Sequence, residues 1–361
     1  MALPKEDTDS WQEEIEFYLS STRDQRDGRA RELGMKDRLS YEARMRERNI
    51  HLSDGRSFNV SDDERVVVSL PPVKLLEPRI HKDVGDDEEI MVLHCSDGHA
   101  AKITKSFNGN VYKDRMYMMF ESAMEIVRLH RNLYPVKKLY ILNTGDNCQG
   151  ENVFQGSIIG TTEMGARDQV NKLAAPIWND VIGSFKQQFD EVIFEGFPGN
   201  HGYERLAPTT SRLDLFLYDV LQAGIGNNPG IKVNVHEEFA DVININGFRF
   251  FCFHGDGIPC QQGIPYFAID RALKAWYIQF GGFSYACGGH FHKRHSDEMA
   301  SKIEYFMCGS LVSDDDWALQ KMKISSNPSQ WIYGVHARYG VTFRYPLVVD
   351  SKFLPESNKN E

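Results

Sequence analysis

Residues 90–100 read IMVLHCSDGHA, an apolar run that gives way abruptly to the polar sequence Asp97-Gly98-His99. A short apolar run that ends in small and polar residues is typical of a buried strand. The carboxylate and the imidazole then stand at the carboxyl end of that strand, where the side chains of α/β sheets converge on ligands. This stretch therefore predicts a central strand with functional side chains at its end.

The pattern of a strand followed by polar residues recurs four times further along the chain. These later runs end in Gly145-Asp146-Asn147, Gly199-Asn200-His201, His254-Gly255-Asp256 and Gly289-His290-Phe291-His292. Amphipathic segments lie between the first runs, and one of them has an apolar face that we predict to be core, made of Met116, Met119, Phe120, Met124 and Val127. Because alternating strands and helices give way to consecutive strands, we predict an α/β fold, a four-layer α/β/β/α sandwich of two mixed sheets.

Composition divides the chain into four segments. They are a helical, polar N-terminal region at 1–55, a linker or lead-in at 56–89, the main domain at 90–350 and a polar tail at 351–361. Within the first segment, ARELGM at residues 30–35 has the Ala-x-x-x-Gly spacing of a helix-turn-helix. The helix expected after it lacks a β-branched core position. Two interpretations of this segment are therefore open, a degenerate helix-turn-helix and a solvated pair of charged helices. We prefer the solvated pair.

Charge and cysteine content narrow the functional class. The 361 residues carry a net charge of −10, which argues against a broadly basic protein that coats nucleic acid but leaves room for a local basic groove. The six cysteines form no CxxC pair, so we expect buried thiols in a reducing compartment. The sequence has neither a secretory signal at its start nor an apolar run long enough to span a membrane. We expect a cytoplasmic protein without a membrane partner.

The residue types at the strand ends indicate metal binding. Asp, Asn and His together suit divalent ions such as Mn²⁺, Fe²⁺ and Zn²⁺. Glycine beside nearly every one of these residues lets the backbone turn tightly and leaves room for a substrate. In this order the motifs DxH, GDxx, GNH, H and GHxH resemble the signature of the calcineurin-like metallophosphoesterases, over roughly residues 90–345.

The resemblance implies a site with two divalent metal ions. Mn²⁺ is the first choice, with Fe²⁺, Zn²⁺, Mg²⁺ and Ni²⁺ as alternatives. One ion would be held by Asp97, His99, Asp146 and His292, and the other by Asp146, Asn200, His254 and His290. A hydroxide shared by the two cations would attack the phosphorus, and His201 would protonate the leaving group.

One departure from the family pattern concerns His201. Many members follow the GNH motif with an acidic residue that orients the histidine, but Gly202 stands there in this chain. We expect Tyr203 or Glu204 to take over that role. Two other histidines have simpler interpretations: His94 points away from Asp97 by strand alternation and is structural, and His295 is a surface residue.

The finer pattern resembles a branch of DNA-repair-exonuclease-like, SbcD-type proteins that is common in phage genomes. The resemblance rests on GDNCQGENVFQG from residue 145, FHGDGI from residue 253 and the long stretch from CGSLVS at 308 to GVTFRYP at 346. It makes Asn147, Tyr203, Arg205, Lys293 and Arg294 candidates for substrate binding. Further cations that could follow a phosphodiester backbone are Arg271, Lys274, Lys321 and Lys323, and candidate stacking surfaces are Tyr266, Trp317 and Trp331.

Three functional hypotheses follow. The first is a metal-dependent phosphodiesterase or nuclease that acts on DNA, in the cytoplasm of a bacterial host if the chain is phage-encoded. The second is a phosphatase or phosphodiesterase for a nucleotide or another small molecule, and the third is a non-catalytic DNA-binding or assembly factor with structural metal. The resemblance also suggests that the chain could form a homodimer, and that an ATPase or a phage replication or repair protein could be its partner.

Overall fold

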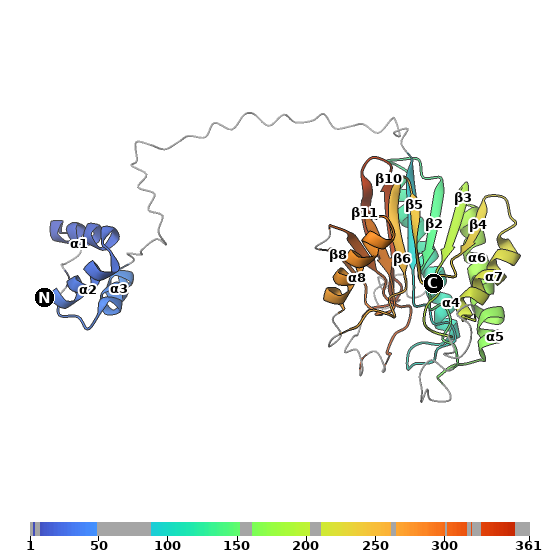
Figure 1. Ribbon diagram of the computed structural model, residues 1–361, viewed down its shortest axis with the longest axis horizontal. Helices are drawn as coiled ribbons and strands as arrows, with labels where there is room; N and C mark the ends of the chain where they lie inside the picture. Colours follow the sequence, from blue (N-terminus) through green and yellow to red (C-terminus); the bar gives the residue numbers. More distant parts are fainter. Residues whose placement is uncertain are drawn as a thin grey trace, which may run out of the picture. The chain divides into compact units, whose positions relative to one another are not determined.

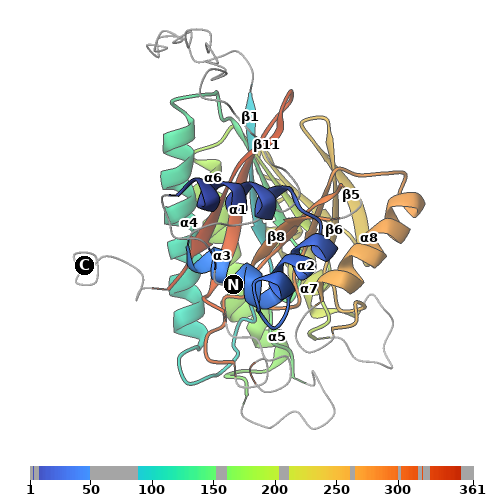
Figure 2. The same cartoon turned by 90° about the vertical axis from the view of Figure 1, so that its left-hand side faces the viewer.

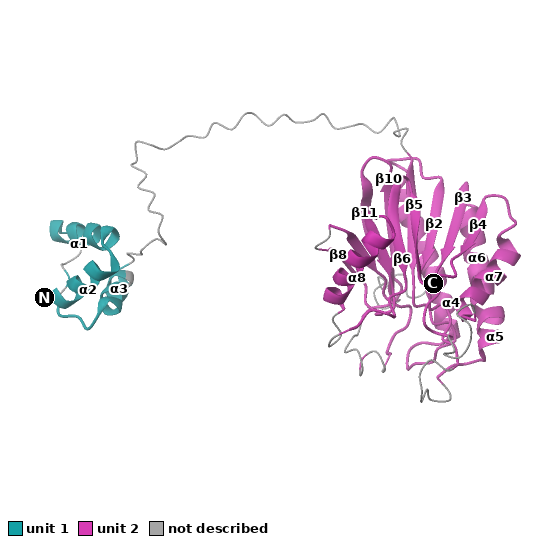
Figure 3. Ribbon diagram, in the orientation of Figure 1, with its two compact units in different colours: residues 1–78 teal, residues 79–361 magenta. Residues whose placement is uncertain are grey.

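The computed structural model describes residues 3, 8–48, 88–151, 161–202, 211–260, 265–299, 302–315, 319 and 326–350. The chain divides into two compact units, residues 1–78 and residues 79–361 (Figure 3). Our predictions for most of the linker, for the tail and for several single residues lie outside the described residues; the single residues are Tyr203, Glu204, Arg205, Trp317, Lys321 and Lys323.

The N-terminal unit consists of three helices around a small core of its own. They are α1 (Asp9–Ser20), α2 (Arg23–Glu32) and α3 (Arg38–Glu47). As the ARELGM pattern predicts, Ala30 is fully buried and Gly34 makes the turn with a φ of +72°. The core is made of Trp11, Tyr18, Ala30, Leu33, Tyr41 and Met45. α1 contributes Trp11 and Tyr18 to this core and α3 contributes Tyr41 and Met45, so the helices share a core that our interpretation as a solvated helical pair did not include.

The larger unit contains a first, six-stranded mixed sheet. Its strands are β1 (Glu89–Cys95), β2 (Lys138–Asn143), β3 (Glu191–Gly196), β4 (Ile231–Val235), β10 (Ser329–His336) and β11 (Gly340–Val348), in the order β11-β10-β1-β2-β3-β4. The first four strands run parallel, and β10 pairs antiparallel with β1. Helices α4 (Gly109–His130), α5 (Ala166–Asp168), α6 (Ala175–Lys186) and α7 (Leu213–Ile225) and the π-helical segment η2 (Gln169–Ala174) connect these strands.

A second, five-stranded mixed sheet follows in the chain. Its strands are β5 (Ala240–Ile245), β6 (Phe248–Phe253), β7 (Tyr285–Gly288), β8 (His295–Glu298) and β9 (Glu304–Met307), in the order β5-β6-β7-β9-β8. Helix α8 (Tyr266–Gln279) connects β6 to β7 and packs on the outer face of this sheet (Figures 1 and 2).

Strand alternation sorts the apolar side chains of β1 into two layers. Met91 and Leu93 face the helices α4, α6 and α7, whereas Val92 faces the second sheet. Because α8 closes the far side, the order of layers is helix, sheet, sheet, helix, and the predicted four-layer α/β/β/α sandwich is confirmed. Among the described residues no helix is both long and apolar enough to cross a membrane.

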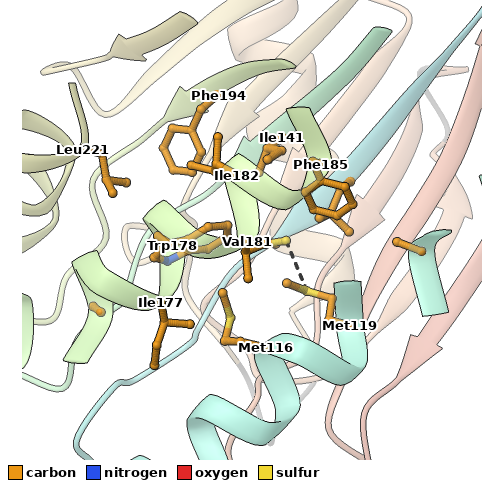
Figure 4. Packing of buried hydrophobic residues seen from close by; sticks show 14 of the residues in the cluster. Met116, Met119, Ile141, Ile177, Trp178, Val181, Ile182, Phe185, Phe194 and Leu221 are labelled. Atoms are coloured by element: carbon orange, nitrogen blue, oxygen red, sulfur yellow. Dashed lines mark hydrogen bonds between the residues drawn. The ribbon is translucent and has the colours of Figure 1, made fainter. Parts of the chain in front are cut away.

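The predicted core face of α4 is also confirmed. Met116, Met119, Met124 and Val127 are buried, and Phe120 is half-buried against the same cluster. Figure 4 shows Met116 and Met119 in the cluster that contains Trp178 of α6. Each fully buried methionine of this kind contributes about 1.5–3 kcal/mol to folding. This packing holds α4 against β1 and so fixes the strand that carries the first motif.

Candidate metal centre

The sheet topology brings the motif residues to one place. Because β1, β2 and β3 are parallel, the residues that follow them lie at the same edge of the first sheet: Asp97 and His99, then Asp146, then Asn200 and His201. The parallel strands β6 and β7 of the second sheet do the same for His254, His290 and His292. The chain thus gathers side chains that lie nearly two hundred positions apart.

The first group of side chains consists of Asp97, His99 and His292. The Nε2 atoms of the two histidines are 2.9 Å apart. Oδ1 of Asp97 lies 3.4 Å from Nε2 of His292 and 3.8 Å from Nε2 of His99. All three residues are buried, so their polar atoms converge on a point shielded from bulk water.

The second group consists of Asp146, His254 and His290, together with Asn200. Nε2 of His254 lies 3.1 Å from Oδ2 of Asp146. Oδ1 of Asn200 lies 3.0 Å from that same Nε2 and 2.8 Å from Nδ1 of His290. Asp146 is also close to His99 and His201, with which it forms a further group, so its carboxylate connects the two sites.

These residues fit divalent cations. Nitrogen and oxygen ligands stand about 2.0–2.2 Å from Zn²⁺, so two ligands of one such ion lie roughly 3 Å apart, close to the 2.9 Å between His99 and His292. Oδ1 of Asp97 and Nδ1 of His99 are buried without a hydrogen-bond partner in the described part of the chain. A buried carboxylate oxygen without a partner is costly, and a cation between the two side chains would remove that cost for Asp97.

The backbone at these positions is strained. Asp97, His99 and Asp146 have φ values of 54°, 49° and 57°, and His290 and His292 have values of 71° and 53°. Side chains other than glycine rarely adopt this left-handed region, and a residue held there costs about 1–3 kcal/mol. Five of the seven candidate ligands therefore sit in a conformation that the surrounding structure must impose, a feature typical of functional sites.

Two of the neighbouring glycines make room for the opposite loop. A Cβ on Gly199 would lie 2.1 Å from Oδ1 of Asp146, and one on Gly289 would lie 1.9 Å from Oγ of Ser96 and 2.6 Å from Oδ2 of Asp97. At these two positions our expectation that glycine leaves room for a substrate was wrong: the space is taken by the ligand residues of the other strands.

Asp214, at the start of α7, supports two of the motifs from behind. Its buried carboxylate accepts hydrogen bonds from the backbone N–H groups of Asp146, Asn147 and Gly199 at 2.8–2.9 Å. Burial, followed by the charge of Asp146, raises the pKa of Asp214, and the donated N–H groups oppose that rise. Sequence reasoning missed this residue, because an acidic residue in the first turn of a helix has an ordinary interpretation there.

The orientation of His201 has a source that the sequence did not indicate. Nδ1 of His201 lies 3.0 Å from the backbone oxygen of Gln149. A carbonyl only accepts hydrogen bonds, so Nδ1 carries a proton, and Nε2 faces Oδ2 of Asp146 at 3.9 Å. A backbone carbonyl thus does what an acidic residue in place of Gly202 would do. Tyr203 and Glu204, which we expected in this role, lie outside the described residues.

The two carboxylates make the cluster attractive to positive charge. Burial opposes protonation of His254, but the charges of Asp146 and Asp97 outweigh it and raise its pKa to about 10. Burial likewise opposes protonation of His292, whereas Asp315 and Asp97 raise its pKa to about 9. Groups that hold a proton this firmly stand in a negative field, and a metal ion would experience the same field.

Asp315 is a further residue that sequence reasoning missed. Its Oδ2 lies 3.5 Å from Nδ1 of His292, on the side of the ring away from Asp97, and 2.6 Å from Nζ of Lys102. A carboxylate on the outer nitrogen of a histidine fixes the ring and makes the inner nitrogen a better ligand. Asp315 lies in the acidic run 314–316, where nothing distinguishes it in sequence from its neighbours.

The candidate substrate residues have different placements. Asn147 is buried, and its amide nitrogen lies within hydrogen-bond distance of Asn143, Asp214 and Tyr218, contacts that give it a structural role; its part in substrate binding stays a prediction. Lys293 is exposed directly after His292. Arg294 is half-buried, with its guanidinium 5.3 Å from the ring centre of Trp331.

The aromatic residues that we predicted as stacking surfaces also have different placements. Trp331 belongs to the core between the sheets and donates to the backbone of Met307, so it offers no stacking surface. Tyr266 is half-buried and stacks on His295, with ring centres 4.0 Å apart. His295, which we expected to be a simple surface residue, is therefore packed against α8. His94 is buried between the sheets, as expected, 3.3 Å from Oγ1 of Thr144.

No protein-family model and no curated protein matches the chain. Among solved structures, it is similar to Vps29 from Cryptosporidium parvum, with 16% identity over 73% of this chain and 97% of that one and a TM-score of 0.33. A predicted phosphoesterase from Streptococcus pneumoniae aligns at 10% identity over 72% and 97%, with a TM-score of 0.30. A 5′-nucleotidase from Candida albicans aligns at 12% identity over 75% and 53%, with a TM-score of 0.35. Because these TM-scores are low, the fold assignment rests on the sheets and helices of the chain itself.

Proposed function

We propose that the chain is a two-metal-dependent phosphoester hydrolase of the calcineurin-like type that acts on phosphodiester bonds of DNA, with Mn²⁺ as the preferred ion. The observation that carries the proposal is the convergence of the motif side chains from both sheets into two linked groups, with a shared carboxylate at Asp146. Buried groups without partners and left-handed backbone at the same positions support it.

The residues of the chain have distinct tasks in this proposal. Asp97, His99 and His292 would hold one cation, and His254, His290 and Asn200 the other, with Asp146 between them. Two bound divalent cations would supply Lewis-acid stabilisation of the phosphoryl oxygens. The chain itself fixes their ligands through Asp214 and Asp315.

His201 is the group that would move a proton. Burial lowers its pKa, so it is largely neutral before a substrate arrives. A phosphodiester close to Nε2 brings negative charge, which raises the pKa and allows Nε2 to carry a proton. With Nδ1 held on the Gln149 carbonyl, that proton faces the site and can pass to the departing alkoxide.

The choice of DNA over a small ester rests on cations beside the motif residues. Lys293 directly follows His292 and is exposed, and Arg271 on α8 is exposed as well. Both can meet phosphates that lie outside the cleavage position, as a polymer requires and a small ester does not. Polymeric phosphodiesters are therefore the substrate class that we favour.

A substrate panel with metal analysis tests the proposal. Purified protein is loaded with Mn²⁺, its metal content is measured, and it is offered linear DNA, circular single-stranded DNA, bis-p-nitrophenyl phosphate and p-nitrophenyl phosphate. We expect about two ions per chain, release of nitrophenol from the diester and cleavage of at least one DNA. His236→Gln is a matched control, because His236 pairs with Glu195 at 2.8 Å, outside the cluster, and the variant should keep turnover.

The outcomes separate the hypotheses. Hydrolysis of the monoester alone would exclude a phosphodiesterase and favour a small-molecule phosphatase. Turnover of the small diester without cleavage of any DNA would retain the hydrolase and reject the nuclease. Full metal content without any turnover would favour the non-catalytic assembly factor.

A further inference from the structure

The start of helix α8 exposes an aromatic side chain. Phe267 is 84% exposed, more than any other large hydrophobic side chain in the described part of the chain. It stands in the first turn of α8, which follows the β6 strand and its motif residue His254. Burial of a phenylalanine side chain would contribute about 1.5–3 kcal/mol of free energy, and exposed Phe267 does not gain it. A partner that covers Phe267 would therefore gain this energy.

The neighbouring contacts connect this turn to the motif GHFH. Tyr266 stacks on His295 with an interplanar angle of 27°, and Nζ of Lys293 lies 5.8 Å from the centre of the Tyr266 ring. Lys293 immediately follows His292, a candidate ligand. The exposed Phe267 therefore begins a surface that continues through Tyr266 and Lys293 to the candidate metal centre, which we call the α8 surface, made of Tyr266, Phe267, Arg271 and Lys293.

The charges of the α8 surface favour an anionic partner. Arg271 lies one turn beyond Phe267 on the same side of the helix, is exposed, and has no ion pair within the described ranges. Lys293 is exposed too, with a ring contact but no carboxylate partner there. The nearby Lys274, in contrast, is neutralised by Asp270 at 2.6 Å. The acidic residues of β8, Asp297 and Glu298, follow His295 and are exposed.

We propose that the α8 surface binds single-stranded nucleic acid beside the cleavage position, with bases stacked on Phe267 and phosphates on Arg271 and Lys293; this rests on the proposed phosphodiesterase function. An exposed ring and exposed cations on one surface provide the two contacts that a single strand needs, one for its bases and one for its backbone. A base-paired duplex hides its base faces and cannot use the ring. A protein partner would leave the unpaired cations unexplained.

Binding of the full chain to a fluorescently labelled single-stranded 20-mer, followed by anisotropy without divalent metal, tests the inference. Phe267→Ala should weaken binding about 5-fold or more, the lower end of what loss of one stacked base costs. Arg271→Ala should reduce the slope of log affinity against log salt by about 0.7, the value for one phosphate contact on a single strand.

Two control variants match these changes. Ile278→Ala removes a side chain that is 81% exposed on the same helix, about 16 Å further along the axis. Lys232→Ala removes an exposed lysine that pairs with Glu191 on the other sheet. Both should bind the 20-mer as the unchanged protein does. Equal losses in Phe267→Ala and Ile278→Ala, together with concentration-dependent self-association, would instead identify α8 as a contact between two copies of the chain and overturn the proposal.

Two further readouts separate this inference from the proposed function. In the presence of Mn²⁺, Phe267→Ala should hydrolyse bis-p-nitrophenyl phosphate at the unchanged rate but cleave single-stranded DNA more slowly. If the small diester is hydrolysed and Phe267→Ala binds and cleaves the 20-mer normally, the α8 surface is wrong and the hydrolase stands. If the unchanged protein does not hydrolyse the small diester, the proposed function is wrong. If the protein also binds duplex DNA as tightly as the single-stranded 20-mer, the proposal for the α8 surface is wrong as well.

Discussion

Glu14 in the N-terminal unit and Asp146 in the sandwich are both buried carboxylates, but their surroundings differ. Oε2 of Glu14 lies 2.6 Å from Nη2 of Arg29, and Oε1 accepts a hydrogen bond of 2.5 Å from the hydroxyl of Tyr41. Asp146 faces four histidines and no lysine or arginine in the ion pairs and groups of the described residues. A guanidinium neutralises a carboxylate permanently, whereas an imidazole can release its proton when a cation binds and so leaves the carboxylate available.

The same contrast extends to the arginines of the N-terminal unit. Arg26, Arg31 and Arg38 pair with acidic residues of α2 and α3. A helix-turn-helix that reads DNA needs cations for the phosphates. Here Arg26 instead joins α2 to α3 through Glu42, and Arg31 and Arg38 pair with carboxylates of their own helices. The buried Glu14 of the N-terminal unit is thus paired with a cation, whereas Asp97 in the candidate site keeps a buried oxygen without a hydrogen-bond partner among the described residues.

Removing the shared carboxylate is the strongest way to test this contrast. Asp146→Ala should lose bound Mn²⁺, because both groups of ligands depend on Asp146, and turnover of bis-p-nitrophenyl phosphate should fall by more than ~10⁴-fold. Metal content and initial rates measure the effect. Asp241→Ala is the control, since Asp241 also faces a histidine, at 3.3 Å from Nδ1 of His236, but lies outside the cluster. An Asp146→Ala protein with full metal content would refute the bridging assignment.

The local sequence pattern was sufficient to predict the strands that carry the motifs. The runs that became β1, β2 and β3 are apolar, end in polar residues and belong to parallel neighbours, so the convergence of Asp97, Asp146 and His201 followed from pattern alone. The helices α4, α6 and α7 were predictable for the same reason, because their periodic apolar faces are local properties of the chain.

Long-range pairing and backbone contacts were not predictable. β10 lies beside β1 in the centre of the first sheet, although more than two hundred residues separate them, and no local signal specifies that partner. The carbonyl of Gln149 on His201 is a backbone atom that every residue possesses, so its role depends only on the fold. Helix α8 was missed although its buried residues Ile269 and Leu273 lie one turn apart, because our interpretation of this part of the chain followed the consecutive strands.

Replacing His201 distinguishes a proton donor from a metal ligand. His201→Ala should keep its metal and lose about 10²–10⁴-fold in turnover, the contribution of a general acid. Metal titration calorimetry and rates with the small diester measure the two quantities separately. Because His201 forms a close group with His99 and Asp146, loss of one metal ion in this variant would make His201 a ligand and reject its role as a proton donor.

A smaller effect is expected from Asp315, which contacts the cluster through His292. Asp315→Asn keeps the shape but removes the charge beside Nδ1 of His292, so metal affinity should fall about 10- to 100-fold. Titration with Mn²⁺ measures the affinity, and rates at saturating metal should recover most of the unchanged value. Asp314→Asn, at the neighbouring acidic residue, provides the matched control. Equal affinities for Mn²⁺ in the two variants would show that Asp315 does not support metal binding through His292.

The N-terminal unit should give the smallest effect, and one that leaves turnover unchanged. Burial opposes ionisation of Glu14, but hydrogen bonds from Arg29 and Tyr41 outweigh it and lower its pKa below the ordinary value of 4.5. Because the folded-state pKa is lowered, the stabilisation is complete above pH ~4.5 and is lost as the pH falls through the folded-state value. Arg29 is partly exposed, so Glu14→Gln should cost only about 1 kcal/mol near neutral pH.

Amide exchange by mass spectrometry on the full chain, resolved for α1 and α2, measures this loss as about 5-fold faster exchange. The difference between Glu14→Gln and the unchanged protein should shrink as the pH falls below ~4.5 and disappear below the folded-state pKa of Glu14, where both side chains are uncharged. Glu16→Gln, at an exposed position of the same helix, should change nothing. If Glu14→Gln instead slowed hydrolysis of the small diester, the two units would be functionally connected, and satisfied charge would no longer distinguish structure from site in this chain.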